Sequence, residues 1–391
     1  MALERKRRAR LAWKIVGIIF ALIIAAFVVI FAVGMIGYEV NMGKVEKTEY
    51  LGSDYAPEMV DGTWTFSVPE GEDFRVLQIT DVHLGGGAFS IGKDASALEA
   101  VETLIRRTQP DFVVFTGDMV YPVPPQSGSF NNIRETALLT TLMEKLGVYY
   151  GICLGNHDTE PYSFYNRDQL YEFYAEQKYC VVDRAEGVDD INYAVNIRDL
   201  ETGRIRHTLY LMDTHDYVGD QLINIMSNYD GLHVNQIEWY RSEVARMNGI
   251  NAALGFDGIV PSSLYIHIPL GEYKTAINEY RANCFRDTEN VKHIFGEIGE
   301  NPCPSDVEDD MFETILELNS TKWVFCGHDH VNNVSLEYKG VRLTYGMSID
   351  YLAYIGIAKE EIQRGATIID VMRDGTLSIA PTRLNEDLFK E

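Results

Sequence analysis

The sequence predicts an α/β domain preceded by a single membrane-spanning helix, and three observations support this fold class. Between residues 74 and 154, three apolar runs alternate with two helix-like segments, as in parallel strands joined by crossover helices. Residues 340–384 alternate between apolar and polar side chains, which indicates antiparallel strands. Ahead of the domain, residues 15–38 contain no charged side chain. About 20 apolar residues are enough to cross a bilayer.

Charge and hydropathy set the expected domain boundaries. A basic cluster at residues 4–10 precedes the apolar run, which favours a cytoplasmic N-terminus and an extracytoplasmic domain. We therefore expect a single-pass protein of the cell membrane with a basic tail (1–14), a transmembrane signal anchor (15–38), a linker (39–70) and the folded domain (71–391). The alternative is secretion after signal cleavage near Ala32-Val33-Gly34, although signal h-regions are usually only about 7 to 15 residues long. A buried core helix is disfavoured because the run has no polar face.

The folded part of the chain is strongly acidic. Residues 1–14 hold 6 Lys or Arg and 1 Glu, which leaves 28 basic and 57 acidic residues in the rest of the chain. That balance of −29 repels nucleic acid, so no nucleic-acid partner is expected. Five cysteines without a CxxC spacing argue against a zinc finger. Cys284 and Cys303 flank a polar insert and are the candidate disulfide pair, with free buried thiols as the alternative.

The elements of the domain follow in order after an edge strand or hairpin at 63–68. Further strands are expected at 74–81, 111–118, 148–154, 193–197, 208–213, 263–268 and 323–326, and helices at 94–108, 133–146, 235–247 and 308–318. Asp374-Gly375 is a plausible hairpin turn in the antiparallel tail. Ligands of open α/β sheets bind at the C-terminal ends of parallel strands.

Polar motifs stand at several of these strand ends. In chain order they are Asp81-Val82-His83, Gly117-Asp118, Gly155-Asn156-His157-Asp158, His267 and Gly327-His328-Asp329-His330. Carboxylate, imidazole and amide ligands suit manganese, iron or zinc, and the lack of a thiolate argues against a structural zinc site. The set provides seven plausible metal ligands and one spare imidazole.

The ordered set DxH, GD, GNHD, H and GHxH resembles the calcineurin-like metallophosphoesterase superfamily over about residues 72–350. Tyr265–Tyr273 and Cys326–Asn333 resemble the purple-acid-phosphatase-like group that includes the plant and yeast Dcr2-type phosphatases. The resemblance implies a four-layer α-β-β-α sandwich of two mixed sheets. It also implies two metal ions, divalent or mixed-valence.

The resemblance assigns the ligands to two ions that share one carboxylate. Asp81, His83, Asp118 and His330 would hold one metal, and Asp118, Asn156, His267 and His328 the other. His157 would face the phosphate as proton donor to the leaving group, and Asp158 would hold the His157 tautomer unless it is a helix N-cap. Asp329 is expected to point away from the metals and to be replaceable.

Other residues invite weaker interpretations. Tyr121 has the spacing of the tyrosinate ligand of purple acid phosphatases, but those enzymes lack the first-motif histidine, so we choose His83 as ligand and Tyr121 as a wall residue. His215 could line the cleft. Three tyrosines after the third motif either line the entrance for the substrate or form an aromatic stripe in the hydrophobic core: Tyr162, Tyr165 and Tyr171. Surface or capping roles are expected for His207, His233 and His293.

The resemblance implies a phosphatase, and the N-terminal apolar run is expected to anchor it in the membrane. Its substrate would be a phosphomonoester, hydrolysed by attack of a metal-bridging hydroxide. The alternatives are a phosphodiesterase or nucleotide hydrolase on the same site, and a non-catalytic metal-binding scaffold. Specificity is expected in the loops at 119–132, 158–190 and 271–306.

Overall fold

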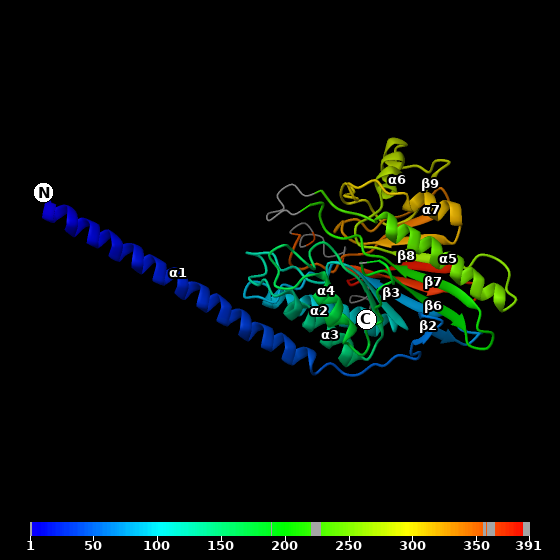
Figure 1. Ribbon diagram of the computed structural model, residues 1–391, viewed down its shortest axis with the longest axis horizontal. Helices are drawn as coiled ribbons and strands as arrows, with labels where there is room; N and C mark the ends of the chain where they lie inside the picture. Colours follow the sequence, from blue (N-terminus) through cyan, green and yellow to red (C-terminus); the bar gives the residue numbers. More distant parts are fainter. Residues whose placement is uncertain (1, 189, 220–227, 355–356, 358–363, 386–391) are drawn as a thin grey trace.

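Two β-sheets form the centre of the domain (Figure 1) in the computed structural model, which describes residues 2–188, 190–219, 228–354, 357 and 364–385. The larger sheet has the strand order β1-β2-β6-β7-β8-β10-β12-β11-β9, and the smaller one β14-β13-β3-β4-β5. Both sheets are mixed. In the smaller sheet β3, β4 and β5 are parallel, whereas β13 pairs antiparallel with β3 and with β14.

The strands of the larger sheet are β1 (Glu58–Val60), β2 (Thr63–Val68), β6 (Tyr193–Asp199), β7 (Ile205–Leu211), β8 (Ser262–Tyr265), β9 (Val291–Phe295), β10 (Thr321–Cys326), β11 (Ser335–Tyr338) and β12 (Val341–Tyr345). Those of the smaller sheet are β3 (Phe74–Ile79), β4 (Phe112–Thr116), β5 (Tyr150–Cys153), β13 (Gly365–Val371) and β14 (Leu377–Arg383).

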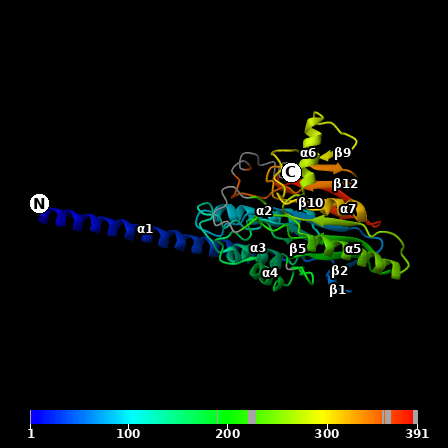
Figure 2. The same ribbon diagram turned by 45° about the horizontal axis from the view of Figure 1, so that its top comes forward.

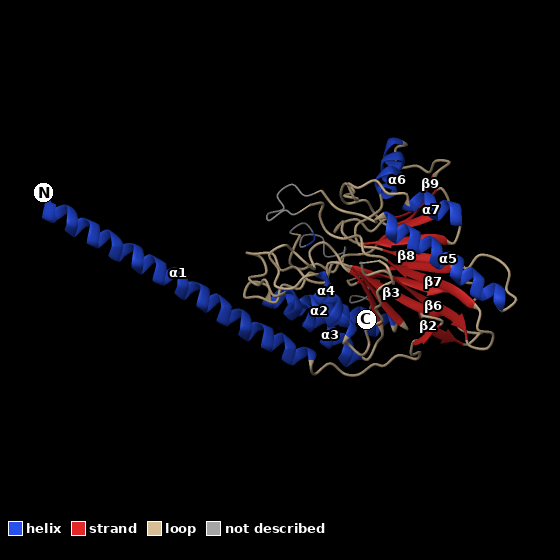
Figure 3. Cartoon of the chain, viewed as in Figure 1, coloured by secondary structure: helices blue, strands red, loops and turns tan. Residues whose placement is uncertain are grey.

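Helices cover the outer face of each sheet (Figures 2 and 3). The smaller sheet is covered by α2 (Ile91–Thr108), α3 (Asn132–Leu146) and α4 (Arg167–Ala175), and the larger by α5 (Val234–Ala253), α6 (Gly271–Ala282) and α7 (Met311–Leu318). One buried cluster joins α2 and α3 to both sheets, and a second packs α5, α6 and α7 on the far side of the larger sheet. The predicted four-layer sandwich is therefore confirmed.

Local signals explain where several helices begin and end. In α3 the Asn131 side chain accepts a hydrogen bond from the backbone of Arg134, and Gly147 ends the helix at φ 69°. In α4, Asn166 and Gln169 form a capping box. The sequence reasoning did not predict α4 and α6, because their apolar residues are few and their flanks are loop-like.

Helix α1 (Ala2–Val45) is one continuous helix that projects from the domain (Figure 1). It is long and apolar enough to cross a membrane, and its most apolar window is not buried by the rest of the protein. Its last turns pack against α2 and α3, where Gly34, Gly37, Asn41 and Val45 are buried. Residues 39–70, predicted as a linker, thus contain the end of α1 and also β1 and β2.

The two sheets meet at the C-terminal ends of their parallel strands. The buried side chain of Gln78 in β3 donates to Thr116 Oγ1 on its own sheet and to the Cys326 carbonyl on the other, each at 3.0 Å. Cys153 at the end of β5 contacts the Tyr265 carbonyl at the end of β8 through its thiol. The C-terminal ends of the parallel strands of both sheets therefore lie at one edge of the sandwich. The polar motifs, which directly follow these strands in the chain, lie at the same edge.

Candidate metal centre

Ligand-type side chains from both sheets converge at this edge. Asp81 and His83 follow β3, and Asp118 follows β4. His267 follows β8, and His328 and His330 follow β10 of the other sheet. The structure groups Asp81, His83, Asp118 and His330 in one cluster and Asp118, His267 and His328 in another, with the candidate ligand atoms of each cluster within 4.8 Å of one another. Asp118 belongs to both clusters, so it is placed to bridge two ions.

The second cluster consists of hydrogen-bond acceptors that face one another. His267 Nδ1 donates to the Thr116 carbonyl at 2.9 Å, so in the neutral ring, the form that binds a metal, Nε2 carries the lone pair. That nitrogen lies 3.2 Å from Asp118 Oδ2, 3.2 Å from Asn156 Oδ1 and 3.3 Å from His328 Nδ1. Asn156 is oriented with its amide oxygen inward because its Nδ2 donates to the Tyr217 hydroxyl at 2.9 Å. Acceptors that converge in this way fit a cation between them.

The backbone of four of these residues is held in an unusual conformation. Asp81, His83, Asp118 and His328 have φ values of 51°, 53°, 53° and 74°, in the left-handed region that non-glycine residues rarely adopt. Such residues persist only where the surroundings hold them, and they concentrate at functional sites. In each case the turn directs the side chain off the strand end toward the clusters.

Close approach explains two of the glycines in the motifs. A Cβ on Gly117, which has φ 87°, would collide with the His267 ring, and a Cβ on Gly155 would collide with the Asp118 carboxylate. Gly117 therefore permits both a tight turn, by its positive φ, and the close approach of His267, whereas Gly155 is required chiefly for space.

The charges in the clusters are strongly coupled. Burial disfavours the ionised form of Asp118, but His267, His157 and His83 more than offset it and hold the pKa of Asp118 well below its usual range. Burial also lowers the pKa of His267, yet Asp118 raises it to about 9. A buried carboxylate that is held ionised needs positive charge beside it, which a divalent cation would provide.

Asp350 is a further acidic residue of the site that the sequence reasoning missed. Its carboxylate lies 3.4 Å from His83 Nδ1 and 3.6 Å from His330 Nδ1, on the ring nitrogens that face away from the shared cluster. It also accepts hydrogen bonds from the backbone of Leu352, Ala353 and Tyr354. It follows β12, the parallel neighbour of β10, so the strand-end rule applied once more would have found it.

The partner of His157 is Glu160 and not Asp158. His157 Nδ1 donates to Glu160 Oε1 at 2.6 Å, and the Glu160 side chain is nearly buried. The Asp158 carboxylate accepts hydrogen bonds from the backbone N–H groups of Asp118, Val120 and Gly155 at 2.7–3.0 Å. The prediction that Asp158 orients His157 is therefore wrong, and so is its alternative as a helix cap, because α4 is capped by Asn166.

Tyr121 and Asp329 border the centre. Tyr121 packs edge-on against His83 at 5.3 Å and His157 at 4.8 Å between ring centroids, and burial raises its pKa to about 12. A neutral phenol in this position agrees with a wall residue. Asp329 lies outside both clusters, but it is buried and its carboxylate accepts from the Cys303 backbone at 3.2 Å. Asp329 therefore points away from the metal ligands as expected, and its buried contacts give it a structural role.

The remaining histidines lie outside the two clusters. His207 is fully buried and binds the Gly375 carbonyl and Ser263 Oγ, so the expected surface location is wrong. His233 occupies the N-cap of α5, as expected for a capping role. His215 stacks on His233 and pairs with Asp190 at 2.9 Å, in a separate group rather than in the wall of the main clusters.

The predicted disulfide bond does not form in the structure. Cys284 and Cys303 are both free and exposed, so the predicted pair is wrong, whereas Cys153, Cys180 and Cys326 are free and buried.

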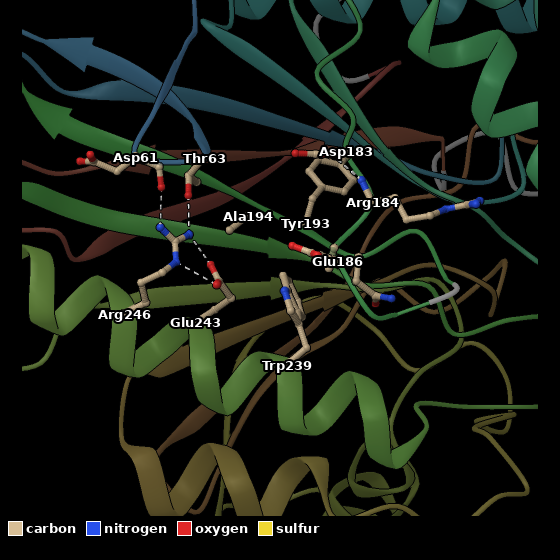
Figure 4. Close-up of a pocket in the computed structure, with 13 residues that line it drawn as sticks. Asp61, Thr63, Asp183, Arg184, Glu186, Tyr193, Ala194, Trp239, Glu243 and Arg246 are labelled. Atoms are coloured by element: carbon tan, nitrogen blue, oxygen red, sulfur yellow. Dashed lines mark hydrogen bonds and ion pairs between the residues drawn. The ribbon is translucent and has the colours of Figure 1, made fainter.

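A pocket of ≈ 380 Å³ beside α5 contains no member of the two clusters. The Arg246 guanidinium in this pocket already donates hydrogen bonds to the Glu243 carboxylate, the Thr63 hydroxyl and the Asp61 carbonyl (Figure 4). We therefore place the chemistry at the clusters.

Comparison with known proteins gives consistent matches. The family model described as calcineurin-like phosphoesterase matches residues 74–332. The chain is 26% identical over 324 residues to "Probable inactive purple acid phosphatase 29" of Arabidopsis thaliana, covering 76% of this chain and 77% of the relative. It is 25% identical over 286 residues to "Phosphatase DCR2" of Saccharomyces cerevisiae, covering 67% of this chain and 45% of that protein. A solved dimetal phosphatase from Danio rerio aligns with 12% identity and a TM-score of 0.45, covering 80% of this chain and 99% of that one.

Proposed function

Because the chain belongs to the calcineurin-like phosphoesterase family, we propose that it is a membrane-anchored, dinuclear metal-dependent phosphatase that hydrolyses phosphomonoesters. The observation that carries this proposal is the pair of clusters that share Asp118, beside the imidazole of His157. Asp81, His83, Asp118 and His330 would hold one ion, and Asp118, Asn156, His267 and His328 the other. Manganese, iron and zinc all suit these ligands.

Each part of the site has a task in this reaction. When bound, the two ions would supply Lewis-acid chemistry, which activates water and neutralises phosphate charge. The His157 side chain, 23% exposed beside the clusters, would donate a proton to the leaving oxygen. Its backbone N–H donates to Asp118 Oδ1 at 2.8 Å, which fixes the imidazole relative to the bridging carboxylate. Glu160 would orient the ring and stabilise its protonated form.

A non-catalytic scaffold is the principal alternative, since the names of three relatives from Arabidopsis thaliana include the words "Probable inactive". In this chain every predicted ligand position carries a metal-binding side chain, and the clusters bring these side chains together. His157 is also present and paired. This completeness favours turnover over a scaffold that only binds metal.

The proposed membrane anchor rests on α1. The basic residues before its apolar window favour a cytoplasmic N-terminus and an extracytoplasmic domain. The uncharged run of 24 residues at 15–38 exceeds the usual h-region of a signal peptide, which supports an uncleaved anchor. Mass spectrometry of the membrane-extracted protein would distinguish an intact N-terminus from cleavage near Gly34.

The decisive experiment combines metal analysis with a substrate panel. The full chain, purified in detergent, is stripped with a chelator, reloaded with manganese, iron or zinc, and assayed on p-nitrophenyl phosphate and bis-p-nitrophenyl phosphate. We expect about two ions per chain and faster monoester than diester hydrolysis. Asp309→Asn, which changes a carboxylate at the start of α7, is the matched control for substitutions of the clusters. A faster diester would favour a phosphodiesterase, and no hydrolysis with any metal would favour the scaffold.

A further inference from the structure

An exposed aromatic patch lies beside the metal centre. We define the patch as Phe89, Phe130, Tyr162 and Phe164. The three phenylalanines are 53%, 40% and 64% exposed, unusual for large apolar side chains in one neighbourhood. Phe130 packs against Tyr162 at 5.8 Å and stacks on Phe164 at 6.4 Å between ring centroids, and the Phe164 N–H donates to the Phe130 carbonyl.

The patch is connected to the end of the proposed membrane span. Gly34 of α1 packs so closely on Gly87 and Ala88 that its Cβ position would lie 3.1 Å from the Ala88 nitrogen. Phe89 is the next residue, and its ring edge lies 3.0 Å from the Cβ position of Gly128, two residues before Phe130. A short chain of contacts thus leads from α1 to the patch.

Helix α1 is fixed to the domain and not attached through a free linker. Asn41 donates to the Ile91 carbonyl at 2.9 Å, and the Arg134 guanidinium lies over the Tyr38 ring at 3.9 Å from its centroid. A Cβ on Gly37 would collide with Ile91, so the helices are in close contact. The orientation of the domain relative to a membrane spanned by α1 is therefore set by packing.

The length of the span places the patch at the bilayer surface. Lys14 precedes the uncharged run, and 20 helical residues from Ile15 rise about 30 Å, which matches the hydrocarbon thickness. Such a span ends at Gly34, where Gly87 and Ala88 pack. Tyr38 and Arg134 then lie at the level of the headgroups, where aromatic and cationic side chains are favoured.

The same loops lead to the metal centre. Tyr162 interacts with Glu160, the partner of His157, and Tyr121 packs on both His157 and His83. Figures 1 and 2 show loops of the cyan-to-green part of the chain on the side of the domain from which the N-terminal part of α1 projects. The loops that carry the patch therefore lie on the side of the domain from which the membrane span projects, and Tyr162 connects them through Glu160 to His157.

We propose that the aromatic patch docks on the outer surface of the bilayer that α1 spans, and that it presents the metal centre to a phosphate monoester carried by a lipid. This inference rests on the proposed phosphatase function and membrane anchor. A site that faces the bilayer is partly shielded from large soluble substrates, whereas a headgroup phosphate lies at the right level. Interfacial aromatic rings suit this position because one side meets apolar chains and the other meets water.

The kinetic test compares two substrates on one protein. The full chain is reconstituted in phosphatidylcholine nanodiscs and assayed on soluble p-nitrophenyl phosphate and on phosphatidic acid in the same disc. Replacing the three phenylalanines of the patch by serine should leave aryl phosphate turnover unchanged. It should lower turnover of the lipid phosphate by on the order of tenfold to a hundredfold, because small misplacements of a substrate cost this much.

The matched control removes the same number of exposed apolar side chains from α7 and from the turns that follow α5 and α6, which cover the other sheet. It consists of serine substitutions at Leu254, Phe285 and Leu316. This variant should retain both activities. Equal effects of the two triple variants on lipid turnover, or no lipid turnover by an enzyme that hydrolyses the aryl ester, would overturn the inference and leave the proposed function standing. Loss of aryl hydrolysis in the unmodified protein would instead refute the proposed function.

A second measurement needs no turnover. Phe164→Trp and Phe285→Trp variants are placed in nanodiscs that contain lipids with a spin label near the headgroup, and tryptophan quenching is compared with the parent protein. Added quenching is expected for Phe164→Trp and not for Phe285→Trp. Equal quenching, or protection of Phe164→Trp by a second copy of the chain in a dimer, would show that the patch does not dock on lipid.

Discussion

The contact between Glu160 and His157 predicts a defect that depends on the leaving group. The carboxylate is nearly buried and lies 2.6 Å from His157 Nδ1. Glu160→Gln keeps the size of the side chain but removes a charge-assisted hydrogen bond, which contributes about 1.5 to 3 kcal/mol. If this bond is lost in full from the protonated, proton-donating form of His157, kcat falls by roughly 10-fold to 150-fold. The loss should therefore appear in kcat, with KM little changed.

The assay measures kcat and KM for a series of phosphate monoesters, from p-nitrophenyl through phenyl to alkyl esters. A proton donor matters most when the leaving oxygen is strongly basic, so the defect of Glu160→Gln should grow from p-nitrophenyl to alkyl phosphate. His157→Asn should show the same trend with a larger loss. An equal loss for every ester, or a change in KM alone, would refute a positioning role for Glu160.

Asp158→Asn is the contrasting variant. Its carboxylate supports the backbone of Asp118 and Gly155, so this substitution should reduce bound metal. Glu160→Gln should retain the metal content of the parent, as measured by elemental analysis. Loss of metal in Glu160→Gln would mean that the residue maintains the centre and does not position His157.

Three further substitutions test the centre and its surroundings. Asp118→Asn should abolish turnover and reduce metal content, because one carboxylate serves both clusters. Asp350→Asn should weaken metal binding by about 10-fold to 100-fold, measured by titration, since it contacts the outer nitrogens of His83 and His330. Burial raises the pKa of Glu135 well above its usual range. A raised carboxyl pKa gives stability that is complete below the unfolded pKa, about 4.3, and is lost as pH rises through the folded pKa, so Glu135→Gln should raise the melting temperature more at alkaline than at acid pH.

Each of these expectations has a control and a contradicting result. Asp309→Asn controls for loss of a carboxylate, and unchanged activity in Asp118→Asn would refute the dinuclear site. For Asp350→Asn, saturating metal should restore most turnover, and unchanged affinity would show that the contacts to the rings do not tune binding. Glu144→Gln, a carboxyl on the same helix, controls for Glu135→Gln. A pH-independent difference in melting temperature would contradict the proposed ionisation.

The predicted ligand set was accessible from the sequence because each ligand lies within a short motif directly after a strand. Parallel strands bring their C-terminal ends together, so the residues after β3, β4 and β5 had to meet. Asp350 was missed because residues 340–384 were expected to form antiparallel strands, whereas β12 runs parallel to β10, so the strand-end rule was not applied there. Glu160 was missed because adjacency favoured Asp158, whose side chain turns inward to the backbone N–H groups.

Other errors have a similar origin in three-dimensional geometry. The polar insert between Cys284 and Cys303 suggested a disulfide bond, but the residues between them form loops and β9, and both thiols are exposed and free. His207 was taken for a surface residue because its neighbours are polar, whereas β7 lies inside the larger sheet and buries it. Burial of a polar side chain depends on the position of its strand in the sheet, which a local pattern does not give.

The location of the ligands has a mechanical consequence for the fold. Each cluster takes members from both sheets, with Asp81, His83 and Asp118 on one side and His267, His328 and His330 on the other. Bound ions would act as cross-links between the two sheets at one end of the sandwich. The spacing of the sheets, set by packing such as the Phe66 ring of β2 against the Phe74 ring of β3 at 4.9 Å between ring centroids, would then fix the separation of the ligands. Substitutions deep in the core, far from any phosphate, could thus tune metal affinity by moving one sheet against the other.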